Sequence, residues 1–100
     1  MTQDAYREST EEIDCFIYAA GEHLREALEH RAANRIAEAE QSDRDVFEAM
    51  AFAISEAEHE GLYLEPEYVS DLLDVPLDVA EAMVEIGEQF LQRNREARYG

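Results

Sequence analysis

The sequence predicts an all-α protein, a small bundle of about four helices of which two are long and one or two are short. Glu, Ala, Leu and Arg are the most frequent of the 100 residues, and these are strong helix formers. Only four Gly and two Pro are present, which leaves little material for turns. No segment alternates apolar and polar residues as a half-buried strand does. A chain of this length forms one domain, 1–100, and we expect its ends to fray over 1–8 and 96–100.

The first predicted helix begins at Ser9, because Ser9 and Glu12 have the spacing of a capping box. Apolar residues then recur at helical spacing and should be buried: Ile13, Phe16, Ile17, Ala20, Leu24, Ala27 and Leu28. Arg31 and Arg35 fall on the same face of this helix. Either the helix extends past the core there, or the two guanidinium groups meet acids within the chain or across an interface.

A second capping box, Ser42 with Asp45, predicts the start of the next helix. The apolar residues that should be buried along it are Val46, Phe47, Met50, Ile54 and Ala57. Gly61 is suited to close its C-terminus, and a short connector over 62–64 follows.

The C-terminal half predicts a short helix that Pro66 opens and a last helix over about 76–95. The last helix should bury Leu77, Ala80, Met83, Val84, Gly87, Phe90 and Leu91. The order of helix, tight turn and longer helix over 67–83 is that of a helix-turn-helix, although Asp74 stands where Gly is usual. Acids occupy the positions at which a DNA-recognition helix carries Arg, Lys, Asn or Gln. The segment is therefore either ordinary packing of small helices or a motif of inverted charge that could occupy a groove built for DNA.

Charge is distributed unevenly along the chain, whose formal net charge is −17. Every cation is Arg, and the segment 45–92 contains thirteen Asp and Glu and no cation. Such a field excludes direct binding to nucleic-acid phosphates, which requires Lys and Arg. It favours a partner that is itself basic.

The last predicted helix carries the most regular acidic pattern of the chain. Its carboxylates, which we name the acidic stripe, fall within about 80° of one another on a helical wheel: Asp78, Glu81, Glu85 and Glu88. Successive members are about 4.5–6 Å apart along the axis, which resembles the spacing of charges on a nucleic-acid backbone. The alternative is an ordinary solvated helix face.

A second patch is predicted on the preceding helix, where Phe52 points away from the apolar face. Its acidic neighbours in the patch are Asp45, Glu48 and Glu56. An exposed aromatic side chain among acids is typical of an anchor for a protein partner, and Tyr63 and Tyr68 could act similarly. The alternative is that Phe52 packs against another helix of the same molecule.

Metal binding and catalysis have little support in the sequence. Glu56 and His59 have the spacing of a di-iron carboxylate motif, but His23 and His30, which would supply a second motif with Glu26, are about 10.5 Å apart along a helix. Cys15 lies off the apolar stripe with no base nearby in sequence, and no phosphate-binding loop or hydrolase motif is present. We therefore expect no cofactor, no metal site and no enzymatic activity.

Three hypotheses follow, and no motif identifies a family. The first is a cytoplasmic, non-enzymatic DNA mimic that inhibits a basic nucleic-acid-binding protein, as small acidic proteins of phages and mobile elements inhibit CRISPR effectors or restriction enzymes; this analogy is one of class only. The second is a structural or adaptor homodimer that pairs through its long first helix and has an acidic, solvated surface. The third is a carboxylate–histidine metal carrier. No signal peptide or membrane span is predicted.

Overall fold

The structure, a computed structural model, describes the backbone of residues 3–99 and the side chains of 11–97. The described backbone contains four helices and no strand, which confirms the all-α prediction: α1 Gln3–Ala32, α2 Ile36–His59, α3 Pro66–Leu73 and α4 Leu77–Tyr99. Fraying at the two ends stays a prediction, and residues 1–2 and 100 lie outside the described residues.

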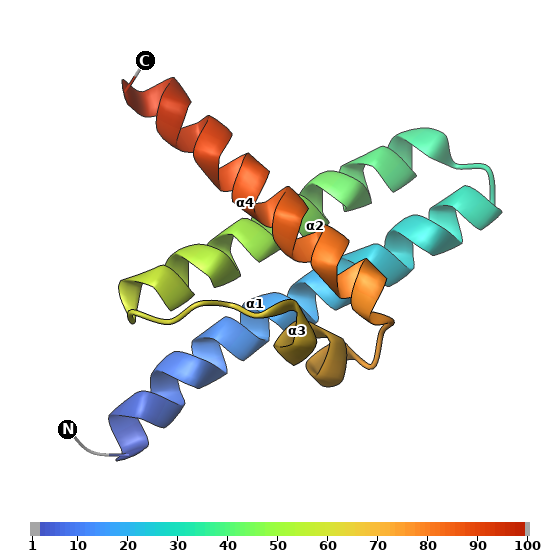
Figure 1. Cartoon of the computed structure of the whole chain (residues 1–100). Coiled ribbons are helices and arrows are strands. Elements are labelled where there is room, and N and C mark those ends of the chain that lie inside the picture. The colour runs from blue at the N-terminus through green and yellow to red at the C-terminus, as the bar shows by residue number, and fades with distance from the viewer. Residues whose placement is uncertain (1–2, 100) are drawn as a thin grey trace.

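Helices α1 and α2 form a long antiparallel hairpin (Figure 1). The turn between them is centred on Asn34, which is left-handed with φ of 59°. The N–H of Asn34 donates to the carbonyl of Arg31 at 3.0 Å, and the N–H of Arg35 donates to the carbonyl of His30 at 2.7 Å. This is the Schellman pattern that closes a helix, and Asn is one of the few residues that adopt its left-handed position readily.

The predicted start of the second helix at Ser42 is wrong, since α2 begins at Ile36. Ser42 lies inside α2 and is 5% exposed. The spacing Ser-x-x-Asp also occurs by chance within helices, and the true boundary signal was Asn34, which can end a helix as Gly does.

The predicted start of the first helix at Ser9 is also wrong, because α1 begins at Gln3. No Gly or Pro lies between Gln3 and Ser9, so nothing in the sequence stops the helix from extending toward the N-terminus.

Helices α2 and α3 are also closed by a left-handed residue, as α1 is. Gly61, at φ of 74°, closes α2 as predicted, with its N–H donating to the carbonyl of Glu58 at 2.9 Å. Asp74 closes α3 with φ of 54°. Asp74 therefore occupies the left-handed position of the turn, where a helix-turn-helix usually has Gly. A short polar side chain such as that of Asp tolerates this conformation.

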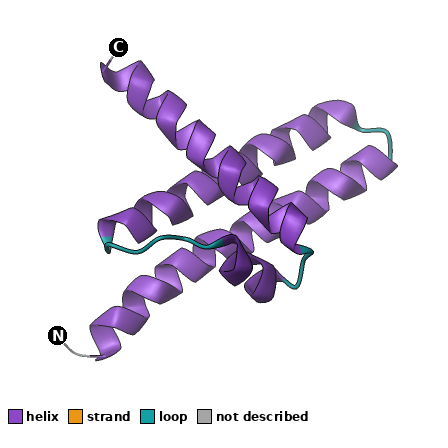
Figure 2. Ribbon diagram, in the orientation of Figure 1, coloured by secondary structure: helices purple, strands orange, loops and turns teal. Residues whose placement is uncertain are grey.

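Helices α3 and α4 form a second layer over the hairpin (Figure 2). Helix α4 crosses α2. Helix α3 packs against both α1 and α4. The core lies between the layers and includes Ile17, Met50 and Val69, which are fully buried. With extents of 50 × 37 × 20 Å the molecule is thin. Its radius of gyration of 14.3 Å exceeds the value of about 13 Å expected for 100 residues.

Two residues predicted to be buried are exposed. Leu28 is 60% exposed and Leu77 is 43% exposed. Leu28 lies toward the end of the hairpin, which extends beyond α3 and α4 (Figure 1), and Leu77 is the first residue of α4. Helical spacing gives the direction of a side chain but does not show where the covering helix ends.

Candidate protein-binding surfaces

The acidic stripe lies on the side of α4 that faces away from the hairpin. Its four carboxylates, Asp78, Glu81, Glu85 and Glu88, are all exposed. The buried residues Ala80, Met83 and Val84 attach the opposite side of α4 to the core. Among the described side chains, 11–97, none of the ion pairs involves a member of the stripe.

The arginines that form ion pairs pair with other acids. Arg25 donates to Glu22 at 2.7 Å and to Glu29 at 2.8 Å along α1. The hydrogen bond that Arg25 donates to Glu22 is the largest cause of the raised pKa of Arg25. These contacts satisfy Arg25 locally, so its charge is not directed to the stripe.

Arg31 pairs with Asp43 across the α1–α2 hairpin. The hydrogen bond to Asp43 is the largest cause of the raised pKa of Arg31. Arg31 therefore meets an acid within the chain, one of the alternatives that the sequence left open. Arg35 lies at the N-cap of α2, between the two helices.

The second predicted patch is centred on Phe52, which is 50% exposed. Its ring packs against Phe16 of α1 with centroids 5.6 Å apart and planes inclined by 33°. The predicted packing of Phe52 against another helix of the same molecule is therefore confirmed. Half of its surface is still exposed, and its role as an anchor for a partner stays a prediction. Glu48 beside it is exposed, whereas Asp45 and Glu56 are half-buried.

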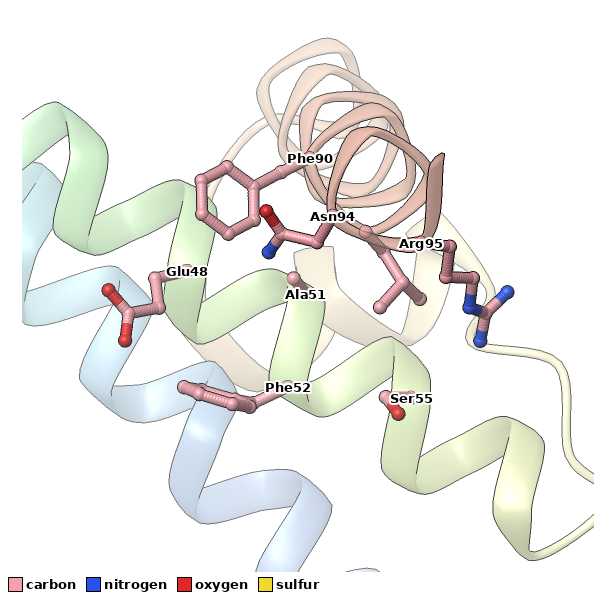
Figure 3. A pocket seen from close by; sticks show the side chains of 8 residues that line it. Glu48, Ala51, Phe52, Ser55, Phe90, Asn94 and Arg95 are labelled. Carbon is pink, nitrogen blue, oxygen red and sulfur yellow. The ribbon is translucent and has the colours of Figure 1, made fainter. Parts of the chain in front are cut away.

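A groove lies between α2 and the C-terminal part of α4, with a volume of about 490 Å³ (Figure 3). We name it the Phe52 groove; its lining residues are Glu48, Ala51, Phe52, Ser55, Phe90, Leu91, Asn94 and Arg95. In Figure 3, Phe90 and Asn94 extend from α4 above the groove while Phe52 and Glu48 border it from α2. The groove forms because α4 crosses α2 and then continues beyond it (Figure 1).

A shallower hollow of about 250 Å³ adjoins the groove on the α1 side. It is lined by Phe16, Ala19, His23, Asp45, Glu48, Ala49 and Phe52. Because Glu48 and Phe52 line both depressions, the two form one continuous surface, which we name the Phe52 surface, with Phe52 in its middle.

Sequence reasoning missed the contribution of α4 to this surface. Phe90 was expected in the core but is half-buried and borders the groove. Asn94 and Arg95 were not predicted to line a site. The Arg-rich segment 93–98 was the available signal, since several charges at the end of an amphipathic helix indicate that no other helix covers it.

The stripe and the Phe52 surface lie on different sides of α4. At about 100° per residue, Phe90 is about 160° from the centre of the stripe on the helical wheel. Glu88 of the stripe also lines a separate hollow, whose other lining residues include Glu58, Tyr63 and Arg95. The structure therefore does not bring the two predicted acidic patches together into one site.

Of the two predicted tyrosine anchors, Tyr63 is 70% exposed, whereas Tyr68 is less exposed at 38%. The Tyr68 hydroxyl donates a hydrogen bond to Asp14 and so ties α3 to α1. Both tyrosines line a hollow of about 210 Å³ with Ile13, Ala57, Leu62, Leu64 and Glu65. Tyr68 therefore has a structural contact, and Tyr63 is the more available for a partner.

The histidines occupy different places in the fold. His23 Nδ1 lies 3.6 Å from Glu26 and 3.9 Å from Asp45, between α1 and α2. His59 is exposed at the end of α2, and Cys15 is exposed on α1 as predicted. Over the described part of the chain, no three or more His, Cys, Asp and Glu side chains are grouped so that they could hold a metal ion.

Comparisons with protein-family models, with curated proteins and with solved structures found no match to this chain. Within the described residues, no helix combines the length and apolar character needed to cross a membrane.

Proposed function

We propose that this protein is a non-enzymatic inhibitor whose acidic stripe occupies the basic, nucleic-acid-binding surface of another protein. The observation that carries the proposal is the exposure of Asp78, Glu81, Glu85 and Glu88 without a cation partner among the described side chains. Four carboxylates on one rigid helix form a preorganised anionic surface, which attracts a basic cleft and directs its approach.

The helix that carries the stripe also supports the proposal. α3, the turn at Asp74 and α4 have the order of a helix-turn-helix, and the left-handed Asp74 suits a tight turn. In a DNA-binding protein the second helix of that motif enters the major groove. Here the second helix is acidic, so its complement is a basic groove that otherwise receives nucleic acid.

The proposal places the protein in the cytoplasm, where nucleic-acid-binding enzymes are accessible. Small inhibitors of CRISPR or restriction complexes encoded by phages and mobile elements are one class of such proteins, and the relation to that class is an analogy of charge and size. The second predicted patch, made of Asp45, Glu48, Phe52 and Glu56, enters this proposal less directly. The Phe52 surface, to which Asp45, Glu48 and Phe52 belong, also includes the cation Arg95.

The test is capture of basic proteins by the immobilised chain, followed by elution with duplex DNA. The stripe variant carries Asp78→Asn, Glu81→Gln, Glu85→Gln and Glu88→Gln. A matched control neutralises four exposed acids outside the stripe: Glu11, Glu12, Glu40 and Glu60. Both variants have the same net charge, so a difference between them reports the position of the charges.

We expect nucleic-acid-binding proteins to be retained at low salt, released by DNA and lost from the stripe variant, while the control variant retains them. Purified captured enzymes should then be inhibited by the wild type and by the control. Equal retention by the stripe variant, or release by salt but not by DNA, would show that the stripe does not occupy a nucleic-acid site.

A further inference from the structure

We infer that the Phe52 surface is where two copies of this chain associate, through a two-fold interface separate from the acidic stripe. The surface is apolar at its centre, where Phe52 is 50% exposed and lies between Phe16 on one side and the groove bordered by Phe90 on the other. Aromatic side chains at the middle of a patch are the usual source of binding energy in protein interfaces.

The charges of the surface select a second copy as the occupant. Asp45 lines the hollow on the α1 side and Arg95 lines the groove, and Figure 3 shows Glu48 and Arg95 at opposite ends of that groove. A two-fold axis near Phe52 exchanges the two sides, so Arg95 of one copy would meet the acids of its partner. A uniformly basic partner would instead place a cation against Arg95.

The positions of the arginines in the chain also favour a second copy as the partner. In the segment 45–100, Arg occurs only at the C-terminal end of the chain, at Arg93, Arg95 and Arg98. The described part of that end, at the end of α4, extends beyond α2 (Figure 1). Arg95 donates to Glu58 at 2.8 Å, but both side chains are about half exposed. An exposed ion pair of this kind contributes little, so Arg95 can exchange it for an acid on a second copy.

The dependence of binding on salt should differ between this interface and the proposed inhibitory contact. Each copy has a net charge of −17, so repulsion opposes the pairing of two copies at low ionic strength. Salt screens that repulsion. Association of two copies should therefore strengthen with salt, whereas binding of the stripe to a basic protein should weaken.

The experiment measures molar mass by sedimentation equilibrium of the full chain in about 50 mM and about 500 mM NaCl, which span the range over which charges become screened. We expect a shift from the chain mass of 11.5 kDa toward twice that value as salt rises. Phe52→Asp should weaken association at least about tenfold, in line with loss of a central aromatic anchor. Leu28→Asp is the matched control, since Leu28 is as exposed but lies off this surface, and it should leave the mass unchanged.

A charge exchange tests the register without disturbing the core, because Glu48 and Arg95 are exposed. Arg95→Glu should weaken association and the additional change Glu48→Arg should restore it, whereas Glu58→Gln alone should have no effect. Circular dichroism checks that each variant is folded.

The inference is overturned if the wild type keeps the monomer mass in high salt, if Leu28→Asp and Phe52→Asp weaken association equally, or if the double charge variant is no better than Arg95→Glu. The stripe variant should still associate, so failure of this inference and failure of the proposed inhibition give different results.

Discussion

Gly87 of α4 lies so close to Met50 of α2 that a Cβ atom added to Gly87 would be 2.8 Å from the Cβ of Met50 and 3.1 Å from its carbonyl carbon. Two helices can approach this closely only where one of them lacks a side chain. The contact fixes where α4 crosses α2, and with it the position of the Phe52 groove on one side of α4 and of the stripe on the other.

Gly87→Ala should therefore destabilise the fold. The added methyl group meets the Cβ and the carbonyl carbon of Met50, neither of which can rotate away. Overpacking of this kind costs about 1–3 kcal/mol, more than the gain of about 1 kcal/mol in helix propensity. We expect a lower free energy of unfolding in urea.

Gly21→Ala provides the matched control for that measurement. A Cβ on Gly21 would meet the tip of the Leu73 side chain at 2.8 Å, and a leucine tip can change rotamer. Gly21→Ala should be close to neutral. If it destabilises as much as Gly87→Ala, the backbone contact with Met50 is not the cause.

The effect of substitutions at Asn34 on the free energy of unfolding should depend only on how well the new residue adopts the left-handed backbone conformation. At φ of 59° Ala is more strained than Asn, whose short polar side chain tolerates the left-handed region, so Asn34→Ala should lower the free energy of unfolding by about 1 kcal/mol. Asn34→Gly should be neutral or stabilising, because glycine adopts this conformation without strain. Thermal unfolding of both variants checks this, and equal loss in both would point to the Asn34 side chain instead.

The acidic stripe should reduce the stability of the isolated protein. Neutralising Glu81, Glu85 and Glu88 to Gln removes three neighbouring repulsive pairs, including the one with Asp78. At about 0.2–0.5 kcal/mol each, the variant should be more stable by roughly 0.6–1.5 kcal/mol at low salt. The gain should shrink in about 500 mM NaCl, where screening already weakens the repulsion. A loss of stability would mean that the carboxylates make favourable contacts within the fold.

The Tyr68 hydroxyl should contribute to the docking of α3 on α1. Tyr68→Phe removes its hydrogen bond to Asp14 and should cost about 0.5–1.5 kcal/mol of unfolding free energy. Tyr63→Phe, at a side chain that is 70% exposed, should change nothing measurable. Chemical denaturation of the two variants side by side makes the comparison.

The ion pairs of Arg25 and Arg31 should give stability that is constant between about pH 6 and about pH 9. Both guanidinium pKa values are raised above the ordinary value for arginine, so any stability linked to them is fully present at both pH values and is lost only as the pH rises through the raised pKa. The urea midpoint of Arg31→Gln should therefore differ from that of the wild type by the same amount at both pH values. A difference that changes with pH would implicate another titrating group.

The sequence was sufficient to predict the helices but not all of their boundaries. Gly61 and Pro66 marked true ends because their conformational preferences are strong and local. Asn34 was missed since Asn favours the left-handed region less strongly than Gly, and Ser42 misled because its spacing to Asp45 is common within helices.

The candidate surfaces were predictable only in part, for a physical reason. The exposure of the stripe follows from the periodicity of one helix, so it could be derived from the sequence. The Phe52 groove depends on where α4 crosses α2, and that crossing is set by the contact of Gly87 with Met50. Packing between helices distant in sequence is not contained in the pattern of either helix.

The three-residue turn at Asn34 has a further consequence for how the chain folds. It joins α1 and α2, whose mutual packing is the most extensive in the molecule, so much of the fold consists of neighbours in sequence. Contacts of this kind form quickly, in microseconds to milliseconds for small helical proteins. We expect the hairpin to assemble before α4 docks on it. A substitution at Gly87 would then change mainly the rate of unfolding, whereas one at Asn34 would change the rate of folding.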